Sequence, residues 1–283
     1  MRFWVTGAHG MLGREVCAML TARELPVIAT DRKLDITDLA AVEDFAAREA
    51  FTHVINCAAY TGVDACEAHE ADAYRVNADG PGYLARVARA KNALAIHVST
   101  DYVFDGAGNA PYQETDPTGP INAYGRTKLA GEQQFFAEDG GYVVRTSWLF
   151  GARANFVTTM LRLMSERPEV RVVDDQTGRP TYAPDLAAVL VELAVRRPAP
   201  GIYHFANAGQ VTWYGLANAA RTEARARGRT DLAAILSPIT TAQFPTPARR
   251  PAWSVLATGK IEQLDCRPRP WREALTAYFE ALP

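Results

Sequence analysis

Short apolar runs alternate with longer amphipathic stretches through the first half of the chain. Runs rich in β-branched and aromatic residues begin at Phe3, Val27, His53, Ala95 and Val143. The stretches between them have apolar residues at helical spacing and lengths that suit crossover connections. They predict helices over residues 11–22, 39–49, 71–90 and 124–137. This alternation is typical of βαβ units and predicts an α/β fold with a doubly wound parallel sheet in residues 1–150.

The pattern changes after about Gly151, where prolines interrupt the apolar runs more often. We predict that residues 151–283 form mainly a smaller α/β domain, which binds the substrate. Strands expected near 170–173 and 202–205 fit either sheet, so the chain is free to return to the first domain. Pro270 is expected to start a terminal helix that packs its apolar side on the body of the protein.

Composition and charge exclude several classes of protein. Hydrophobic residues make up 48% and charged residues 22%, as in soluble globular proteins. The formal net charge of −2, without a long block of either sign, argues against a nucleic-acid binder or a binder of acidic membranes. The most apolar stretch, residues 186–195, contains Glu192 and is too short to cross a bilayer. The apolar start ends at Gly7 before a secretory segment forms, so we expect a cytoplasmic protein.

Cysteine and histidine spacing does not indicate a metal cluster or a disulfide framework. The four cysteines have no Cys-x-x-Cys spacing, and the five histidines are scattered along the chain. We therefore assign no metal-ligating residues from spacing.

A glycine-rich turn follows the first predicted strand and opens the first predicted helix. Gly7, Gly10 and Gly13 let the backbone approach a pyrophosphate, which the helix N-terminus attracts. Asp31 lies 18 residues beyond Gly13, at the end of the second strand. A carboxylate there accepts both ribose hydroxyls of NAD, whereas Arg32 and Lys33 suit the 2′-phosphate of NADP. The alternatives are a tight turn without a ligand for the glycines and a solvated turn for the basic pair. The context favours a Rossmann-type dinucleotide site.

A second group of candidate residues carries proton-transfer chemistry. Thr100 and Asp101 follow the strand that contains Val98, at the strand end where parallel sheets bind ligands. Tyr124 and Lys128 stand four residues apart, so a helix presents both on one face. The ammonium is expected to lower the pKa of the phenol, which then protonates a carbonyl oxygen held by Thr100. An ordinary surface helix is the alternative for Tyr-x-x-x-Lys alone.

These motifs occur in the order found in a known family. The chain has Asn56-Cys57-Ala58-Ala59-Tyr60 after the third strand, Ser99 to Gly106 after the fourth and Tyr124-Gly125-Arg126-Thr127-Lys128 on the next helix. The segments 145–148, 175–181 and 245–251 extend the match to nearly the whole chain. The chain resembles the extended short-chain dehydrogenase/reductase superfamily and, within it, the dTDP-4-dehydrorhamnose reductases.

The resemblance implies a set of cofactor contacts. It assigns the pyrophosphate to the glycine loop, the adenosine ribose to the end of the second strand, the adenine to the next turn and the rest of the cofactor to the third and fourth strands. In that order the residues are Gly7, Gly10, Met11, Leu12 and Gly13; Asp31 and Arg32; Asp35 and Ile36; then Ala58, Ala59, Tyr60, Thr61 and Val98, with Tyr124 and Lys128 at the nicotinamide end.

The resemblance also implies a catalytic trio and substrate contacts. Thr100, Tyr124 and Lys128 match the catalytic residues, and Thr100 and Asp101 match contacts to the sugar. Trp148 matches a tryptophan that packs on the sugar, with an ordinary core position as the alternative. Arg249 and Arg250 fall near the nucleotide end, with solvated loop charges as the alternative.

The implied activity is transfer of hydride from NADPH or NADH to the C4 ketone of dTDP-4-dehydro-6-deoxy-L-mannose, which gives dTDP-L-rhamnose. The alternatives are a talose- or streptose-type dTDP-4-keto sugar as substrate, or a non-catalytic cofactor-binding regulatory subunit. Some relatives hold Mg²⁺ at a homodimer interface. Glu15 lies in a matching place, but the other ligands are unassigned, so metal dependence and a homodimer stay open. Trp253 and Val255 depart from the family pattern near the nucleotide.

Overall fold

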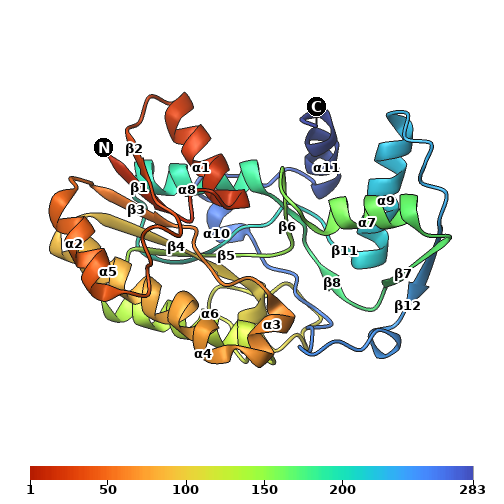
Figure 1. Ribbon diagram of the computed structural model, residues 1–283, viewed down its shortest axis with the longest axis horizontal. Helices are drawn as coiled ribbons and strands as arrows, with labels where there is room; N and C mark the ends of the chain where they lie inside the picture. Colours follow the sequence, from red (N-terminus) through yellow and green to blue (C-terminus); the bar gives the residue numbers. More distant parts are fainter. Residues whose placement is uncertain (283) are drawn as a thin grey trace.

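A six-stranded parallel sheet forms the larger part of the molecule in the computed structural model, which describes residues 1–282 (Figure 1). Its strand order is β10-β5-β4-β3-β1-β2. The strands are β1 (Phe3–Thr6), β2 (Val27–Ala29), β3 (His53–Asn56), β4 (Leu94–Thr100), β5 (Tyr142–Thr146) and β10 (Gly201–His204). The predicted α/β fold is confirmed.

Helices cover both faces of this sheet. α1 (Met11–Ala22) and α8 (Ala183–Arg196) pack on one face. α2 (Leu39–Arg48), α5 (Gly80–Ala90) and α6 (Ala123–Ala137) pack on the other. In β1, Phe3 and Val5 join the first core and Trp4 joins the second. Because both faces are buried, the central strands are mainly apolar and show no regular polar alternation, and the polar residues they contain, such as His97 in β4, are buried as well.

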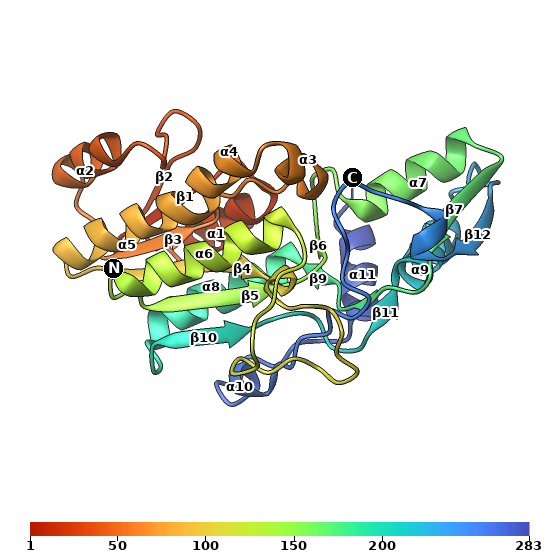
Figure 2. The ribbon, with the colours of Figure 1, turned by 90° about the horizontal axis from the view of Figure 1, so that it is seen from below.

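The smaller part of the molecule lies beyond the carboxyl ends of β5 and β10 (Figure 2). Its core joins α7 (Phe156–Glu166), α9 (Trp213–Ala226) and α11 (Trp271–Glu280) to the parallel pair of β7 (Glu169–Val173) and β12 (Ile235–Ile239). Two shorter pairs connect it to the larger part: β6 (Leu149–Phe150) with β9 (Thr181–Tyr182), and β8 (Thr177–Gly178) with β11 (Val211–Thr212). The remaining short helices are α3 (Val63–Ala68), η2 (Asp101–Val103), η3 (Thr241–Gln243) and α10 (Gly259–Glu262).

Two elements from the second half of the chain belong to the large sheet and its covering layer. β10 pairs with β5, and α8 packs on α1. A division of the chain near residue 150 into two domains stays a prediction, with these two elements as returns of the chain.

The helix predicted over residues 71–90 is not one regular helix. It consists of α4 (Glu70–Tyr74), a π-helical turn η1 (Arg75–Asp79) and α5. The turn carries Asn77, which is buried. The Asn77 amide accepts from Tyr60 N at 2.8 Å and donates to the Tyr60 carbonyl and the Thr127 hydroxyl, both at 3.1 Å. These hydrogen bonds give a physical reason for the π-helical turn between α4 and α5. Such turns occur where a helix must place a side chain out of its regular register.

No helix among residues 1–282 combines the length and the apolar character that crossing a bilayer requires.

The order of the strands places the candidate site. From β1 the chain continues to β2 on one side, whereas β3 pairs on the other side of β1. Ligands of open parallel sheets bind at such a switch point, outside the carboxyl ends of the strands. The loops that start at Gly7 and Cys57 meet there.

Candidate active site

The loop after β1 is shaped for close approach of a ligand. Gly7 has φ +63°, and a Cβ on it would lie 2.6 Å from Ala58 N, so only glycine fits this turn. α1 begins at Met11, and its cap residue Gly10 offers no side chain to the free N–H groups of the first turn. These donors and the helix dipole are available to an anion such as a pyrophosphate.

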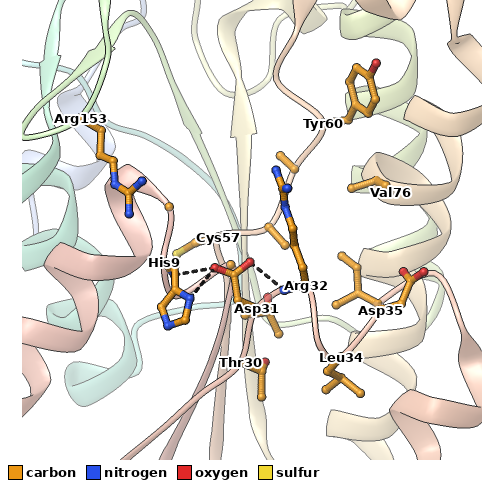
Figure 3. Close-up of a pocket in the computed structure, with 16 residues that line it drawn as sticks. His9, Thr30, Asp31, Arg32, Leu34, Asp35, Cys57, Tyr60, Val76 and Arg153 are labelled. Atoms are coloured by element: carbon orange, nitrogen blue, oxygen red, sulfur yellow. Dashed lines mark hydrogen bonds and ion pairs between the residues drawn. The ribbon is translucent and has the colours of Figure 1, made fainter.

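A first cavity of about 760 Å³ extends from this loop along the ends of β2 and β3 (Figure 3). It gathers nine of the residues assigned to the cofactor: Gly7, Gly10, Asp31, Arg32, Asp35, Ile36, Ala58, Ala59 and Tyr60. Six further lining residues were not singled out in the sequence: Thr6, His9, Thr30, Leu34, Val76 and Arg153. Lys33 is exposed and is not part of the lining.

Asp31 is held against the glycine loop. Its carboxylate accepts from the backbone N–H of His9 at 3.0 Å and from that of Arg32 at 2.8 Å (Figure 3). The imidazole of His9 lies 3.2 Å from the same carboxylate. Arg32 is exposed at the cavity edge. Asp31 and Arg32 therefore both lie where the protein would contact the adenosine ribose and its 2′-hydroxyl or 2′-phosphate.

A second cavity of about 610 Å³ continues from the first toward the smaller part of the molecule. Its lining includes Met11, Leu12, Thr61 and Val98 from the cofactor set, and Thr100, Asp101, Tyr124, Lys128 and Trp148 from the catalytic and substrate sets. The structure thus brings residues that are far apart in the chain to one place.

Local capping positions Tyr124 at the cavity. The Asn122 side chain accepts from Gly125 N at 2.8 Å, which starts α6 and sets Tyr124 in its first turn. Thr100 ends β4, and its hydroxyl donates to Asp101 Oδ1 at 2.9 Å. The Thr100 side chain is also within hydrogen-bonding reach of the Tyr124 phenol.

Lys128 is fully buried one helical turn after Tyr124. Its ammonium donates to the Val98 carbonyl at 2.7 Å and lies 3.3 Å from His97 Nε2. The other ring nitrogen of His97 is 3.0 Å from the Asn56 side-chain amide. Burial lowers the pKa of His97 well below its usual range, so the imidazole is neutral beside the ammonium.

The electrostatics of the tyrosine differ from the sequence prediction. Burial raises the pKa of Tyr124 above its usual value, and the hydrogen bond with Thr100 offsets this only in part. Burial also lowers the pKa of Lys128 to about 8. The prediction that Lys128 lowers the pKa of Tyr124 is therefore wrong for this structure, because burial of the phenol has the largest effect on that pKa. A raised pKa keeps the phenol protonated at neutral pH, as a proton donor requires.

Asp101 presents a buried carboxylate at the wall of the second cavity. Its Oδ2 forms no hydrogen bond of good geometry within the described part of the chain, although the Ser254 hydroxyl lies near enough to lower the pKa of the carboxyl in part. Burial raises the pKa of Asp101 to about 6. An unpaired buried acceptor at a cavity wall is costly unless a ligand donates to it, and a sugar hydroxyl is such a donor.

Trp148 is held in an unusual backbone conformation at the far wall of the second cavity. Its φ is +47°, which is strained for a bulky residue. Its ring stacks on Trp213 with centroids 3.5 Å apart and planes at 8°. Trp213 Nε1 donates to Gln176 at 3.1 Å, which fixes the second ring. Trp213 was not singled out in the sequence, because only the folded chain brings α9 to Trp148.

A third cavity of about 250 Å³ lies between α7, β7 and the loop that follows η3. Phe156, Trp213 and Phe244 give it an aromatic lining, and Arg171 and Arg250 contribute positive charge. Arg250 forms a two-pronged ion pair with Asp64, at 2.5 and 2.8 Å. Arg249 is exposed and lies outside the lining of all three cavities, as does the buried Gly13.

A magnesium site has no support in this structure. Among residues 1–282 no group of three or more histidine, cysteine, aspartate or glutamate side chains is arranged to hold a metal. Glu15 lies on α1, outside the cavities, and burial raises the pKa of its carboxyl. The four cysteines are free thiols.

Comparison with known proteins identifies the family. The family model described as RmlD substrate binding domain matches residues 1–283. The chain belongs to this family. A dTDP-4-dehydrorhamnose reductase of Streptomyces griseus is 46% identical over 295 residues, which cover 99% of this chain and 94% of the relative. A dTDP-4-keto-6-deoxy-D-glucose reductase of Streptomyces niveus is 42% identical over 287 residues, covering 99% and 97%.

A solved structure agrees with the family and the fold. The dTDP-4-dehydrorhamnose reductase of Bacillus anthracis in complex with NADP has a TM-score of 0.93 to this chain and 35% identity, covering 99% of both chains. The resemblance to the dTDP-4-dehydrorhamnose reductases that the motifs indicated is confirmed.

Proposed function

We propose that this chain reduces the C4 ketone of dTDP-4-dehydro-6-deoxy-L-mannose to the alcohol, giving dTDP-L-rhamnose. The observation that carries the proposal is the meeting of Thr100, Tyr124 and Lys128 in the cavity that continues the dinucleotide-shaped cleft. The named activities of the two curated relatives support the same class of reaction.

The cleft fits a nicotinamide dinucleotide. Any residue with a side chain in place of Gly7 would fill the space at the loop. The first turn of α1 has no side-chain cap, so its backbone N–H groups are free to donate to the cofactor. When bound, the dihydronicotinamide supplies the hydride that becomes the new C4–H bond of the sugar. Asp31 and Arg32 stand together at the ribose end, so we propose that both NADH and NADPH bind. The NADP complex of the Bacillus anthracis relative favours NADPH.

The residues of the second cavity bind the sugar and transfer the proton to its C4 oxygen. When the sugar binds, the Thr100 hydroxyl turns its single proton from Asp101 Oδ1 to the carbonyl oxygen and holds that oxygen as negative charge develops on it. Tyr124 Oη gives its proton to that oxygen, which completes the hydroxyl group and leaves a phenolate. Lys128 orients the ribose of the cofactor and supplies a positive charge near the phenolate. Asp101 accepts a hydrogen bond from the sugar, and the Trp148 ring packs on it.

The third cavity suits the nucleotide end of the substrate. Its aromatic side chains offer a surface for a thymine ring, and Arg171 and Arg250 suit a diphosphate. We propose Arg250 for this contact, with Asp64 holding its guanidinium in place. Arg249 would reach the substrate only from the outer edge. A dTDP-sugar as small-molecule partner, a cytoplasmic location and a homodimer remain predictions.

A second candidate substrate is dTDP-4-keto-6-deoxy-D-glucose, because the Streptomyces niveus relative is named for it. Both candidate sugars carry the ketone at C4 and differ in ring stereochemistry. Incubation of the purified chain with each dTDP-keto sugar and NADPH, followed by identification of the product, separates them. No turnover of any keto sugar, with dinucleotide bound, would favour the regulatory-subunit alternative.

The variant Tyr124→Phe tests the mechanism. It removes the proton donor and keeps the ring, so we expect kcat to fall by about 10² to 10⁴ while the dissociation constant of NADPH stays unchanged. Tyr83→Phe on α5, outside the three cavities, is the matched control. Wild-type turnover in Tyr124→Phe would overturn the assignment of the donor.

A further inference from the structure

The first and second cavities meet at a narrow set of residues. Gly10, Cys57, Ala58, Ala59 and Arg153 line both cavities. In the proposed function, the adenosine half of the dinucleotide occupies the first cavity and the nicotinamide half the second. The pyrophosphate joins the two halves, so it must cross this junction. Arg153 is the one charged residue of the five.

Arg153 stands opposite the glycine loop. It lies in the segment between β6 and α7, whereas Gly10 precedes α1. Figure 3 shows its guanidinium turned toward the loop that carries His9, on the other side of the cavity from Tyr60 and Asp35. The side chain is exposed at the cavity edge. None of the ion pairs among residues 1–282 engages it, so its charge is available to an anion.

The backbone around Arg153 is fixed by the start of α7. The Asn155 side chain donates to the carbonyl oxygens of Gly151 and Arg153, both at 2.7 Å. The same side chain accepts from Thr158 N at 3.2 Å and so caps the helix. Arg153 is therefore presented to the junction from an anchored segment.

We propose that Arg153 binds the pyrophosphate of the dinucleotide from the side opposite the glycine loop, so that the anion lies between backbone N–H groups and a guanidinium. A planar guanidinium donates two parallel hydrogen bonds to a phosphate, which the glycine loop alone does not supply. The inference rests on the proposed dinucleotide function.

The diphosphate of a dTDP-sugar is the competing anion. Arg153 also lines the second cavity, where that substrate would bind. The third cavity, which suits the nucleotide end of the sugar substrate, has its own arginines, Arg171 and Arg250, and does not include Arg153. The position of Arg153 at the junction of the other two cavities favours the dinucleotide.

The test measures binding of NADPH in the absence of sugar, by titration of the nicotinamide fluorescence, for wild type, Arg153→Ala and Arg153→Lys. We expect the dissociation constant to rise about 10- to 100-fold in Arg153→Ala, and by less in Arg153→Lys, which keeps the charge. Higher salt should narrow the difference between wild type and Arg153→Ala. Arg167→Ala, an exposed arginine at the end of α7 outside the three cavities, is the matched control and should bind as wild type.

Steady-state kinetics separate the two anions. A rise of the KM for NADPH with an unchanged KM for the dTDP-sugar supports the proposal. Unchanged NADPH binding in Arg153→Ala, or a rise confined to the KM of the sugar substrate, overturns it. Because the titration needs no keto sugar, failure of reduction with normal NADPH binding counts against the proposed function alone. A wild-type chain that binds neither NADPH nor NADH overturns both.

Discussion

The strained tryptophan at the far wall of the second cavity depends on a glycine. A Cβ on Gly178 would lie 2.5 Å from Trp148 Cε2, 2.7 Å from Cζ2 and 2.8 Å from the Ser254 hydroxyl. The Gly178→Ala variant must therefore displace the indole ring, which is already stacked on Trp213. Overpacking of this kind costs about 1–3 kcal/mol. Since Trp148 is proposed to pack on the sugar, we expect this cost to appear as weaker sugar binding.

Each 1.4 kcal/mol is a factor of ten, so we expect the KM for the dTDP-sugar to rise about 5- to 100-fold in Gly178→Ala. The dissociation constant of NADPH should not change, because Gly178 lies outside the two cavities proposed for the cofactor. Steady-state kinetics and a nicotinamide fluorescence titration measure the two quantities. Gly259→Ala is the control, since a Cβ on Gly259 meets nothing within 4 Å. A wild-type KM in a folded Gly178→Ala variant would refute the reasoning.

Three further predictions rest on buried charges. Because the Lys128 pKa is about 8, turnover should decline as pH rises through 8, and the pH profile of Lys128→Met should lack that step. Burial raises the pKa of Asp101 from 3.8 to about 6, so the folded chain binds this proton more tightly and loses stability as pH rises from about 4 to 6. In urea unfolding, the free energy of unfolding of Asp101→Asn should rise by up to roughly 3 kcal/mol relative to that of wild type as pH increases over that range. A difference in unfolding free energy between the two proteins that does not depend on pH would contradict the raised pKa of Asp101. Glu132→Gln breaks the buried pair with Arg145 (2.7 Å) and should destabilise the fold by about 3–5 kcal/mol in the same assay, with an unchanged urea midpoint as the contrary result.

Local patterns were enough to predict the elements of the large sheet. The helix predicted over residues 11–22 has those bounds in the structure, and the strand at residues 27–29 likewise. These segments form their core contacts with apolar residues at regular spacing, which the sequence displays directly. The helix over 71–90 failed in its middle because the contacts of Asn77 with Tyr60 and Thr127 are long-range.

The candidate site was predictable where a motif carries its own chemistry, and not where a role arises from folding. Thr100, Tyr124 and Lys128 reach one cavity as expected. The predicted direction of the shift in the Tyr124 pKa was wrong, because spacing along a helix does not show how deeply the phenol is buried. The positions of Trp213 and Arg153 at the cavities depend on segments that are distant in the chain and meet only in the fold, so no local pattern predicts them.

The position of β10 at the edge of the large sheet has a consequence for synthesis of the protein. Its partner β5 ends at residue 146, yet β10 begins only at residue 201. A nascent chain that has emerged as far as β5 therefore exposes an unpaired strand edge of apolar residues. That edge stays open until more than 50 further residues have left the ribosome, since 201 − 146 = 55. During this interval the growing polypeptide carries an open strand edge, the kind of surface that favours aggregation and that chaperones protect.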